Sequence, residues 1–227
     1  RGSPAVRAAA SDPRALERLV RSAFRHNARY YLEVARTPSV TRESLDARLD
    51  IDTPDLVAEA VVPGRAALFV GLHFGSVELP VLFLAFRVGT TVTPMQTVDD
   101  PGLQAWFERT RGVNGVRLVG LREARRTLQD ALHNGIPVGI VGDRDLTGGG
   151  IPIPLFGAPA MLPMGPAMLA VESGAPVYGL SVRRTEGLRF RGRLIAIDVP
   201  TEGTRRERVT ATMTLLASAF EQIVEDA

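Results

Sequence analysis

The sequence contains no cysteine and only three histidines, His26, His73 and His133. The absence of cysteine excludes disulfide bonds, thiolate metal sites and a cysteine nucleophile, and it fits a reducing compartment. A zinc site would need carboxylates for most of its ligands. We therefore expect no metal site.

Lysine is also absent, so all 27 cationic side chains are arginines, set against 25 acidic residues. A guanidinium group can bind two phosphate or carboxylate oxygens at once, which suits anionic substrates. Codon bias in GC-rich DNA produces the same composition, so only particular arginines are informative. They are interspersed with acids and no recognised nucleic-acid motif is present, so we expect no nucleic-acid partner.

At 227 residues, with 45% hydrophobic and 23% charged residues, the chain is long enough for one domain with a substantial core. We expect a single domain over 1–227, with an amphipathic helix at about 13–35 and its main core at about 61–227. The chain opens with RGSPAVRAAA and no initiator methionine, so we expect a tag remnant or a trimmed terminus. No signal peptide is visible, and we expect truncation at either end.

The segment 13–34 repeats apolar residues every three or four positions, which predicts an amphipathic helix. Arginines stand between the apolar positions and give the helix a basic face. Such a face can lie on anionic lipid or can simply be a solvated surface. The apolar positions are Leu16, Leu19, Val20, Ala23, Phe24, Tyr31 and Val34, and the arginines are Arg14, Arg18, Arg21 and Arg25.

The stretch VGLHFGSVELPVLFLAF, residues 70–86, places two ionisable residues, His73 and Glu78, in an apolar run. Residues 66–88 have the length of a membrane span, but a carboxylate near the middle would cost about 2.5 to 3.5 kcal/mol. A buried strand at 66–72 followed by a helix at 76–86 explains the same letters better.

The rest of the chain alternates predicted strands and helices, which indicates an α/β fold with a central mixed β-sheet covered by helices. A glycine loop (147–150) and a proline-spaced segment (151–160) receive no assigned element. Capping residues mark two helix starts: Asp100 with Pro101, and Thr204 with Glu207. Further strands are predicted at 90–96, 137–143, 175–184 and 188–198, and further helices at 101–112, 122–135, 164–174 and 205–224.

His73 and Glu78 are five residues apart, so on one continuous helix their side chains would point about 140° apart. They can meet if His73 lies in the turn that leaves the strand, Gly75 bends the backbone, and Glu78 begins the helix. A carboxylate on one imidazole nitrogen would leave the other free to take a proton from a hydroxyl. The alternative is a core histidine satisfied by a nearby glutamate.

Ser76 could complete a triad as the nucleophile, but F-G-S-V-E is not the G-x-S-x-G elbow that exposes a catalytic serine. Ser76 is better explained as a helix cap or a pocket wall. The attacking hydroxyl then belongs to the substrate, and the His73 and Glu78 pair belongs to a transferase.

Four segments in the order GLHFGSVELP, WFERTRG, VGDRDLTGGGIPIPLFGAPAMLPMGPAMLA and SGAPVYGLSVRR resemble the lysophospholipid acyltransferase superfamily. The resemblance covers about residues 21–184 and is to the branch of lipid A secondary acyltransferases and phosphatidylinositol mannoside acyltransferases. It implies a glycerolphosphate-acyltransferase-like fold. It also implies transfer of a fatty acyl group from a coenzyme A or acyl-carrier-protein thioester to a hydroxyl of a membrane lipid or glycolipid, without a resident cofactor.

The resemblance assigns His73 as the general base and Glu78 as its orienting carboxylate. It implies that the enzyme is peripheral on the cytoplasmic face of the bacterial inner membrane. Arg144 is expected near an oxyanion or a phosphate, with Asp143 and Asp145 holding it in place. The substrate-binding residues expected from the motifs are Gly75, Ser76, Arg109, Arg111, Asp143, Arg144 and Asp145.

Two other functions fit parts of the sequence. Asp143 and Asp145 form a D-x-D pattern, which in a glycosyltransferase would bind a divalent cation on a nucleotide-sugar diphosphate. Alternatively, the chain is a degenerate lipid-binding module that holds acyl chains without turnover. The branch usually continues beyond Glu225 with a tail containing tryptophan and arginine, and its third motif differs from that of the wider superfamily.

Overall fold

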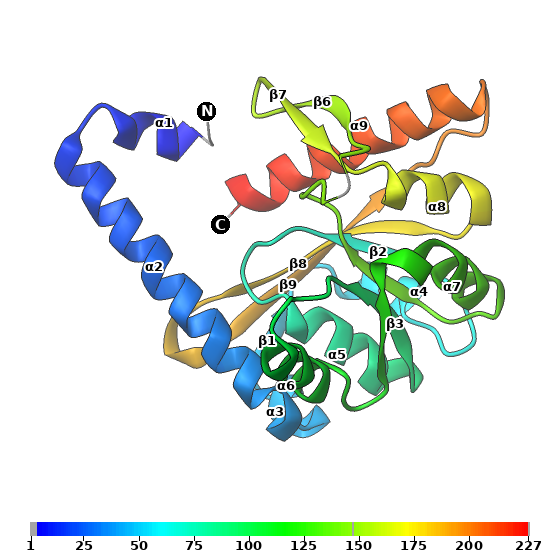
Figure 1. The fold of residues 1–227 in the computed structure, drawn as a ribbon, viewed down its shortest axis with the longest axis horizontal. Coiled ribbons are helices and arrows are strands. Elements are labelled where there is room, and N and C mark those ends of the chain that lie inside the picture. The colour runs from blue at the N-terminus through cyan, green and yellow to red at the C-terminus, as the bar shows by residue number, and fades with distance from the viewer. Residues whose placement is uncertain (1–3, 147, 227) are drawn as a thin grey trace.

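The computed structural model describes residues 4–146 and 148–226, so Thr147 of the predicted glycine loop lies outside it. A seven-stranded sheet forms the centre, in the order β1-β9-β8-β2-β5-β3-β4 (Figure 1). Neighbouring strands are parallel except β8 and β9, which are antiparallel. The predicted α/β fold with a mixed sheet is confirmed. The strands are β1 (Leu49–Ile51), β2 (Leu68–Gly71), β3 (Thr91–Met95), β4 (Val116–Gly120), β5 (Val138–Val141), β8 (Val177–Arg184) and β9 (Phe190–Ile197).

The segment without an assigned element, 151–160, belongs to a small antiparallel hairpin of β6 (Ile151–Leu155) and β7 (Ala158–Leu162). Its alternate prolines sit in paired strands that stand apart from the main sheet, where a missing N–H is tolerated. The backbone N–H of Phe156 in the turn donates to the Glu221 carboxylate, which fixes the hairpin to the last helix.

The predicted helices are present, and the capping residues act as expected. Asp100 accepts a hydrogen bond from the Leu103 N–H at 2.7 Å, and Thr204 with Glu207 forms a capping box. The polar connection after residue 36 contains short elements that sequence patterns did not predict. The helices are α1 (Pro4–Ala10), α2 (Pro13–Arg36), η1 (Thr37–Ser39), α3 (Arg42–Asp46), α4 (Pro54–Ala60), α5 (Glu78–Val88), α6 (Pro101–Arg111), α7 (Leu121–His133), α8 (Gly165–Ser173), η2 (Glu186–Leu188) and α9 (Arg205–Glu225).

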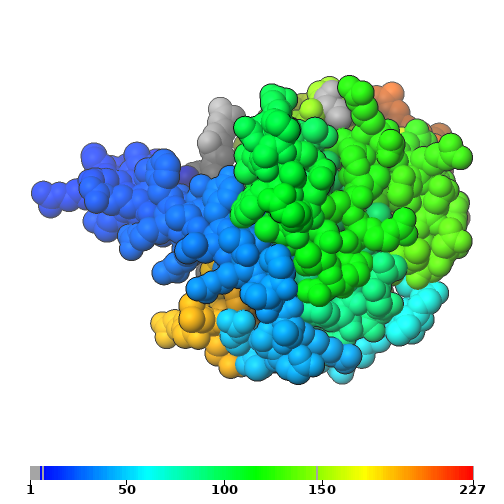
Figure 2. All heavy atoms as spheres, turned by 60° about the horizontal axis from the view of Figure 1, so that its bottom comes forward, coloured from blue at the N-terminus to red at the C-terminus, as the bar shows by residue number. Residues whose placement is uncertain are grey.

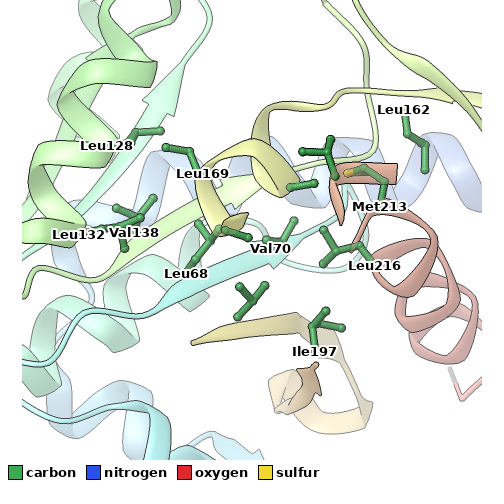
Figure 3. Close-up of a cluster of buried hydrophobic side chains, with 14 of the residues drawn as sticks. Leu68, Val70, Leu128, Leu132, Val138, Leu162, Leu169, Ile197, Met213 and Leu216 are labelled. Carbon is green, nitrogen blue, oxygen red and sulfur yellow. The ribbon is translucent and has the colours of Figure 1, made fainter. Parts of the chain in front are cut away.

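Hydrophobic side chains pack on both faces of the sheet. Leu68 and Val70 of β2 belong to a core with α7, α8 and α9 (Figure 3), while Phe69 between them packs against α4 and α5 on the other face. A central parallel strand is buried on both sides, which explains its continuous apolar sequence. The apolar run at 66–88 is therefore split into β2 and α5. In the described part of the chain, no helix combines the length and apolar character needed to cross a bilayer.

Helix α2 projects beyond the rest of the molecule. Only its carboxyl-terminal part packs on the body, where Val34 is fully buried, and its amino-terminal half extends outward with α1 (Figures 1 and 2). Leu16, Val20 and Phe24 remain exposed on the projecting part, and Phe24 is 73% exposed. The predicted amphipathic helix thus carries an apolar stripe that the described residues leave in solvent.

Candidate active site

The site lies where three neighbouring parallel strands end. β8, β2 and β5 are adjacent in the sheet and run in the same direction, so their carboxyl ends meet at one edge. The chain beyond β2 carries His73 and the chain beyond β5 carries Asp143. Ligand sites in α/β sheets form at this edge because the loops there converge.

The turn after β2 is built around Gly75. Its φ angle is +70°, and a Cβ at this position would lie 2.2 Å from the Val182 carbonyl oxygen of β8. The next residue, Ser76, donates its N–H to that same carbonyl oxygen at 2.7 Å. A side chain at residue 75 would prevent this approach, so the glycine fixes the loop against β8. The predicted turn between strand and helix is confirmed.

Ser76 does not cap helix α5. Helix α5 has Val77 at its N-cap and no side-chain cap bond. The Ser76 hydroxyl is buried and makes no hydrogen bond to a described residue. A buried hydroxyl that neither contacts a base nor reaches solvent is not an activated nucleophile. This burial agrees with the sequence argument against a serine enzyme.

His73 pairs with Asp143, which corrects the expected partner. The His73 Nδ1 lies 2.7 Å from Asp143 Oδ1, and the Gly142 N–H donates to the Gly71 carbonyl at 2.9 Å, holding the two strand ends together. An ionised carboxylate can only accept, so Nδ1 carries the proton and the neutral ring has its lone pair on Nε2. The imidazole is 44% exposed, so a substrate can reach it.

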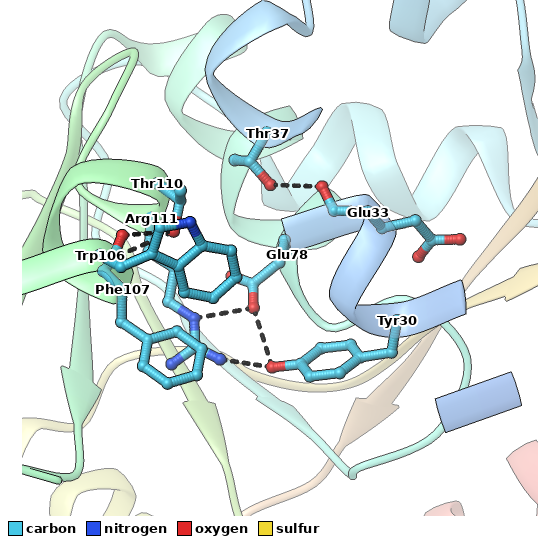
Figure 4. A network of polar contacts seen from close by, with 8 residues as sticks. All are labelled: Tyr30, Glu33, Thr37, Glu78, Trp106, Phe107, Thr110 and Arg111. Atoms are coloured by element: carbon cyan, nitrogen blue, oxygen red, sulfur yellow. Dashed lines mark hydrogen bonds and ion pairs between the residues drawn. The ribbon is translucent and has the colours of Figure 1, made fainter. Parts of the chain in front are cut away.

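Glu78 contacts other partners, so the predicted contact between Glu78 and His73 is wrong. Although Glu78 begins α5 as expected, its carboxylate accepts from Arg111 Nε at 3.0 Å and from the Tyr30 hydroxyl at 3.2 Å (Figure 4). Arg111 also donates to the Tyr30 oxygen, and its guanidinium lies 4.2 Å above the Phe107 ring. The first turn of α5 therefore faces α2 and α6. The network joins α2, α5 and α6 at the start of α5, which directly follows the loop that carries His73.

Burial changes the ionisation of this network. Glu78 is only 7% exposed, and desolvation raises the pKa of its carboxyl, although the Arg111 charge acts in the opposite direction. Burial also raises the pKa of Tyr30 to about 12, and the neighbouring Glu78 charge adds to the effect. Tyr30 is therefore a neutral hydroxyl at physiological pH. Its proton is available to the Glu78 carboxylate.

The other predicted substrate-binding residues occupy different environments. Arg111 is committed to Glu78, whereas Arg109 of α6 is exposed. Arg144 is exposed and has no hydrogen-bond or ion-pair partner among the described residues. Asp145 accepts from the backbone N–H groups of the loop glycines 148 and 150, and Asp143 binds His73. The two aspartates thus organise the loop and the histidine, which corrects the expectation that they hold Arg144.

The sequence patterns did not single out three positions near the site, Tyr30, Arg183 and Arg184. Tyr30 lies four residues before Val34, so it fits the helical repeat as well as its neighbour Tyr31 does, and Tyr30 is the residue turned inward. Arg184 at the end of β8 forms an ion pair with Glu33 of α2, with one contact at 2.7 Å. The preceding Arg183 has no such partner. The two consecutive arginines at a strand end were the available sequence signal.

The apolar residues after the motif are core residues and not an open tunnel. Leu79, Leu82 and Leu84 of α5 are all buried. A shallow apolar depression of about 220 Å³ lies between α4 and α5, and a slot of about 30 Å³ adjoins it beneath Leu180 and Val182. Neither cavity is lined by His73 or Asp143.

Acidic and histidine side chains do not gather into a metal site in the described residues, where no cluster of three or more such ligands occurs. In particular, Asp143 and Asp145 of the D-x-D pattern are engaged separately, by an imidazole and by backbone amides. The pattern therefore has a structural explanation that does not involve a nucleotide sugar.

Comparison with known proteins identifies similar chains. The family model described as bacterial lipid A biosynthesis acyltransferase matches residues 11–227. A phosphatidylinositol mannoside acyltransferase of Mycolicibacterium smegmatis is 28% identical over 164 residues, which are 70% of this chain and 54% of that protein. The Mycobacterium tuberculosis protein of the same name is 32% identical over 153 residues, covering 65% and 48% of the two chains. The chain thus spans about half the length of these relatives.

Among solved structures, the chain is similar to the 1-acyl-sn-glycerophosphate acyltransferase PlsC of Thermotoga maritima. The two share 17% sequence identity, with a TM-score of 0.46, and the match covers 88% of this chain and 83% of that one.

Proposed function

Because the chain belongs to the bacterial lipid A biosynthesis acyltransferase family, we propose that it transfers a fatty acyl group from a thioester to a hydroxyl of a membrane lipid or glycolipid. The observation that carries the proposal is the exposed His73 held by Asp143 at the carboxyl edge of the sheet. This pair can supply a general base without a protein nucleophile.

The proposed reaction follows from the contact of Nδ1 with Asp143, which leaves Nε2 of the imidazole facing away from that carboxylate. His73 Nε2 removes the proton of the acceptor hydroxyl as its oxygen attacks the thioester carbonyl carbon. The carbon–sulfur bond then breaks, and the departing sulfur takes the proton from the imidazolium. Asp143 fixes the ring through Nδ1 and stabilises the positive charge that forms in between. Coenzyme A or an acyl carrier protein supplies the thioester, and no resident cofactor takes part.

In this proposal Glu78 holds the loop that carries His73 in place. Its carboxylate is tied to Arg111 and Tyr30, so it anchors the start of α5 and thereby the loop that carries His73. We therefore reassign the orienting role from Glu78 to Asp143. Glu78 is a positioning residue, and Arg111 holds it instead of binding a substrate phosphate.

The acceptor is proposed to be a lipid because of α2. Val34 is buried against the body, and the exposed Phe24 and Val20, ten and fourteen residues earlier, lie within about 80° of it around the helix axis. The exposed apolar stripe therefore extends from the body beside the active-site network. Arginines on the opposite side of the helix can contact anionic headgroups, as in interfacial helices. We propose that the enzyme docks peripherally, on the cytoplasmic face where thioester donors are made.

The two mycobacterial relatives are named for a phosphatidylinositol mannoside acceptor. We propose an acceptor of the same chemical class here, a glycosylated phospholipid with a free sugar hydroxyl. The unpartnered Arg144 beside the site is compatible with a lipid phosphate.

The test is incubation with labelled acyl-coenzyme A and a panel of phosphatidylinositol mannosides, lysophospholipids and lipid A precursors, read by mass spectrometry. We expect an acylated glycolipid, and a rate about 100- to 10,000-fold lower in both His73→Ala and Asp143→Ala. His133→Ala, on the exposed end of α7, is the matched histidine control and should match wild type.

Each alternative has its own outcome. Thioester hydrolysis without an acylated lipid would indicate a thioesterase, and lipid binding without either product would indicate a binding module. Unchanged acyl transfer in His73→Ala would refute the proposed mechanism.

A further inference from the structure

Half-buried arginines in this protein almost always have a partner. A guanidinium that loses part of its hydration needs hydrogen bonds or an opposite charge to offset the cost. Five of the six half-buried arginines whose side chains the structure describes meet that need through a carboxylate or a backbone carbonyl. Arg183 is the exception, since its guanidinium has no partner among the described residues. The six are Arg87, Arg111, Arg183, Arg184, Arg193 and Arg208.

Arg183 lies beside the loop between β2 and α5, which carries His73. It stands near the carboxyl end of β8, and its Cα is 3.0 Å from where a Cβ on Gly75 would be. Gly75 is two residues from His73, and the residue after Gly75, Ser76, donates its N–H to the same strand. The backbone of Arg183 therefore lies at the edge where the reaction is proposed to occur.

The neighbouring Arg184 is paired, in contrast to Arg183. Successive side chains on a strand point to opposite faces, so Arg184 turns to the opposite side from Arg183 and meets Glu33 of α2. On the same face of β8 as Arg183, Gly179 packs closely against Ala219 of α9. The strand is therefore within contact distance of that helix at residue 179. Arg183 lies on the same face, nearer the carboxyl end of β8 than the part that packs against α9.

We propose that Arg183 binds a phosphate group of a substrate next to His73. A phosphate offers the oxygens that a guanidinium fork contacts in pairs, and it would replace the hydration that Arg183 has partly lost. The phosphate can come from the coenzyme A donor or from the phosphodiester of a glycolipid acceptor. This inference rests on the proposed acyl transfer, which supplies both sources.

Calorimetric binding separates the two sources without depending on turnover. Wild type, Arg183→Gln and Arg117→Gln are titrated with coenzyme A, with pantetheine, with glycerophosphoinositol and with myo-inositol. Arg117, exposed on the edge strand β4, is the matched control for loss of one arginine. We expect Arg183→Gln to weaken one phosphate-bearing ligand by about 10- to 100-fold, while Arg117→Gln binds as wild type does.

The phosphate-bearing ligand that loses affinity identifies the source. Weakened coenzyme A with unchanged pantetheine assigns the donor phosphate, and weakened glycerophosphoinositol with unchanged inositol assigns the acceptor. Arg183→Lys should recover part of the affinity, because it keeps the charge without the fork. The thermal midpoint of Arg183→Gln should not fall below wild type, because no protein contact is removed.

Two results would overturn the proposal: neither phosphate ligand binds wild type, or both bind Arg183→Gln with wild-type affinity. The acyl transfer assay is independent of this result. Its failure with unaltered phosphate binding by wild type would count against the proposed function alone.

Discussion

Replacing Arg111 by methionine should destabilise the protein in a way that depends on pH. Methionine keeps much of the side-chain volume but leaves the Glu78 carboxylate buried without its cation. Breaking a buried ion pair on one side typically costs about 3 to 5 kcal/mol. The carboxyl can take up a proton instead, which limits the charge penalty at pH 7 to about 3.7 kcal/mol for an ordinary pKa near 4.3.

Whether the variant loses stability at low or at high pH follows from the direction of the Glu78 pKa shift. Burial already raises the pKa of Glu78, and removal of Arg111 raises it further. When the pKa of a carboxyl is raised in the folded state, the free energy of unfolding is unaffected below the unfolded-state pKa of about 4.3. It is lowered as the pH rises through the folded-state pKa. The variant should therefore approach wild type near pH 4.5 and fall behind it at pH 7 to 8.

Thermal unfolding of both proteins from pH 4.5 to pH 8 measures this difference. A loss of about 3 kcal/mol corresponds to a midpoint about 6 to 12 °C lower for a chain of this size. The double variant Glu78→Gln with Arg111→Met is the control, because it removes the buried charge and should recover most of the loss at pH 8. A deficit that is the same at every pH, or no recovery in the double variant, would refute the reasoning.

Two further predictions concern the loop that carries His73 and the projecting helix α2. Gly75→Ala should lower the free energy of unfolding by at least about 3 kcal/mol in urea, because its Cβ would meet the Val182 carbonyl. Gly64→Ala, with a similar φ and open space around it, should lose only about 1 kcal/mol. Val20→Ser with Phe24→Ser should reduce cosedimentation with anionic vesicles at least tenfold while leaving the thermal midpoint unchanged, since both side chains are exposed. Equal sedimentation would exclude α2 as the docking element.

The local structure around His73 could be predicted from the sequence because it depends on neighbours. A buried apolar run, a glycine and an acidic residue at the following helix start were enough to place strand, turn and helix. Helix caps at Asp100 and Thr204 were equally local. Short elements in the polar connection were not predicted, because three- to seven-residue segments such as β1 and α4 are stabilised by packing on distant strands.

The partner of His73 could not be predicted in the same way. The five-residue spacing to Glu78 permits a contact across the turn but does not determine which way the carboxylate points. Asp143 is 70 residues away and reaches His73 only because β2 and β5 are parallel neighbours. Strand order is a property of the whole sheet. A pattern within one motif therefore favours Glu78, the carboxylate nearest in the sequence, over Asp143, which contacts His73.

The arrangement also determines how mutational rates should be interpreted. Asp143 contacts the imidazole, whereas Glu78 reaches the loop through the start of α5, so loss of either residue is expected to abolish the proposed acyl transfer for a different reason. A glutamate that anchors α5 affects stability and activity together, while an aspartate that pairs with a half-exposed histidine affects activity with little effect on folding. Rates measured without the free energy of unfolding would therefore assign Glu78 to the chemistry. Measuring both quantities separates a base and its carboxylate from the network that holds them in place.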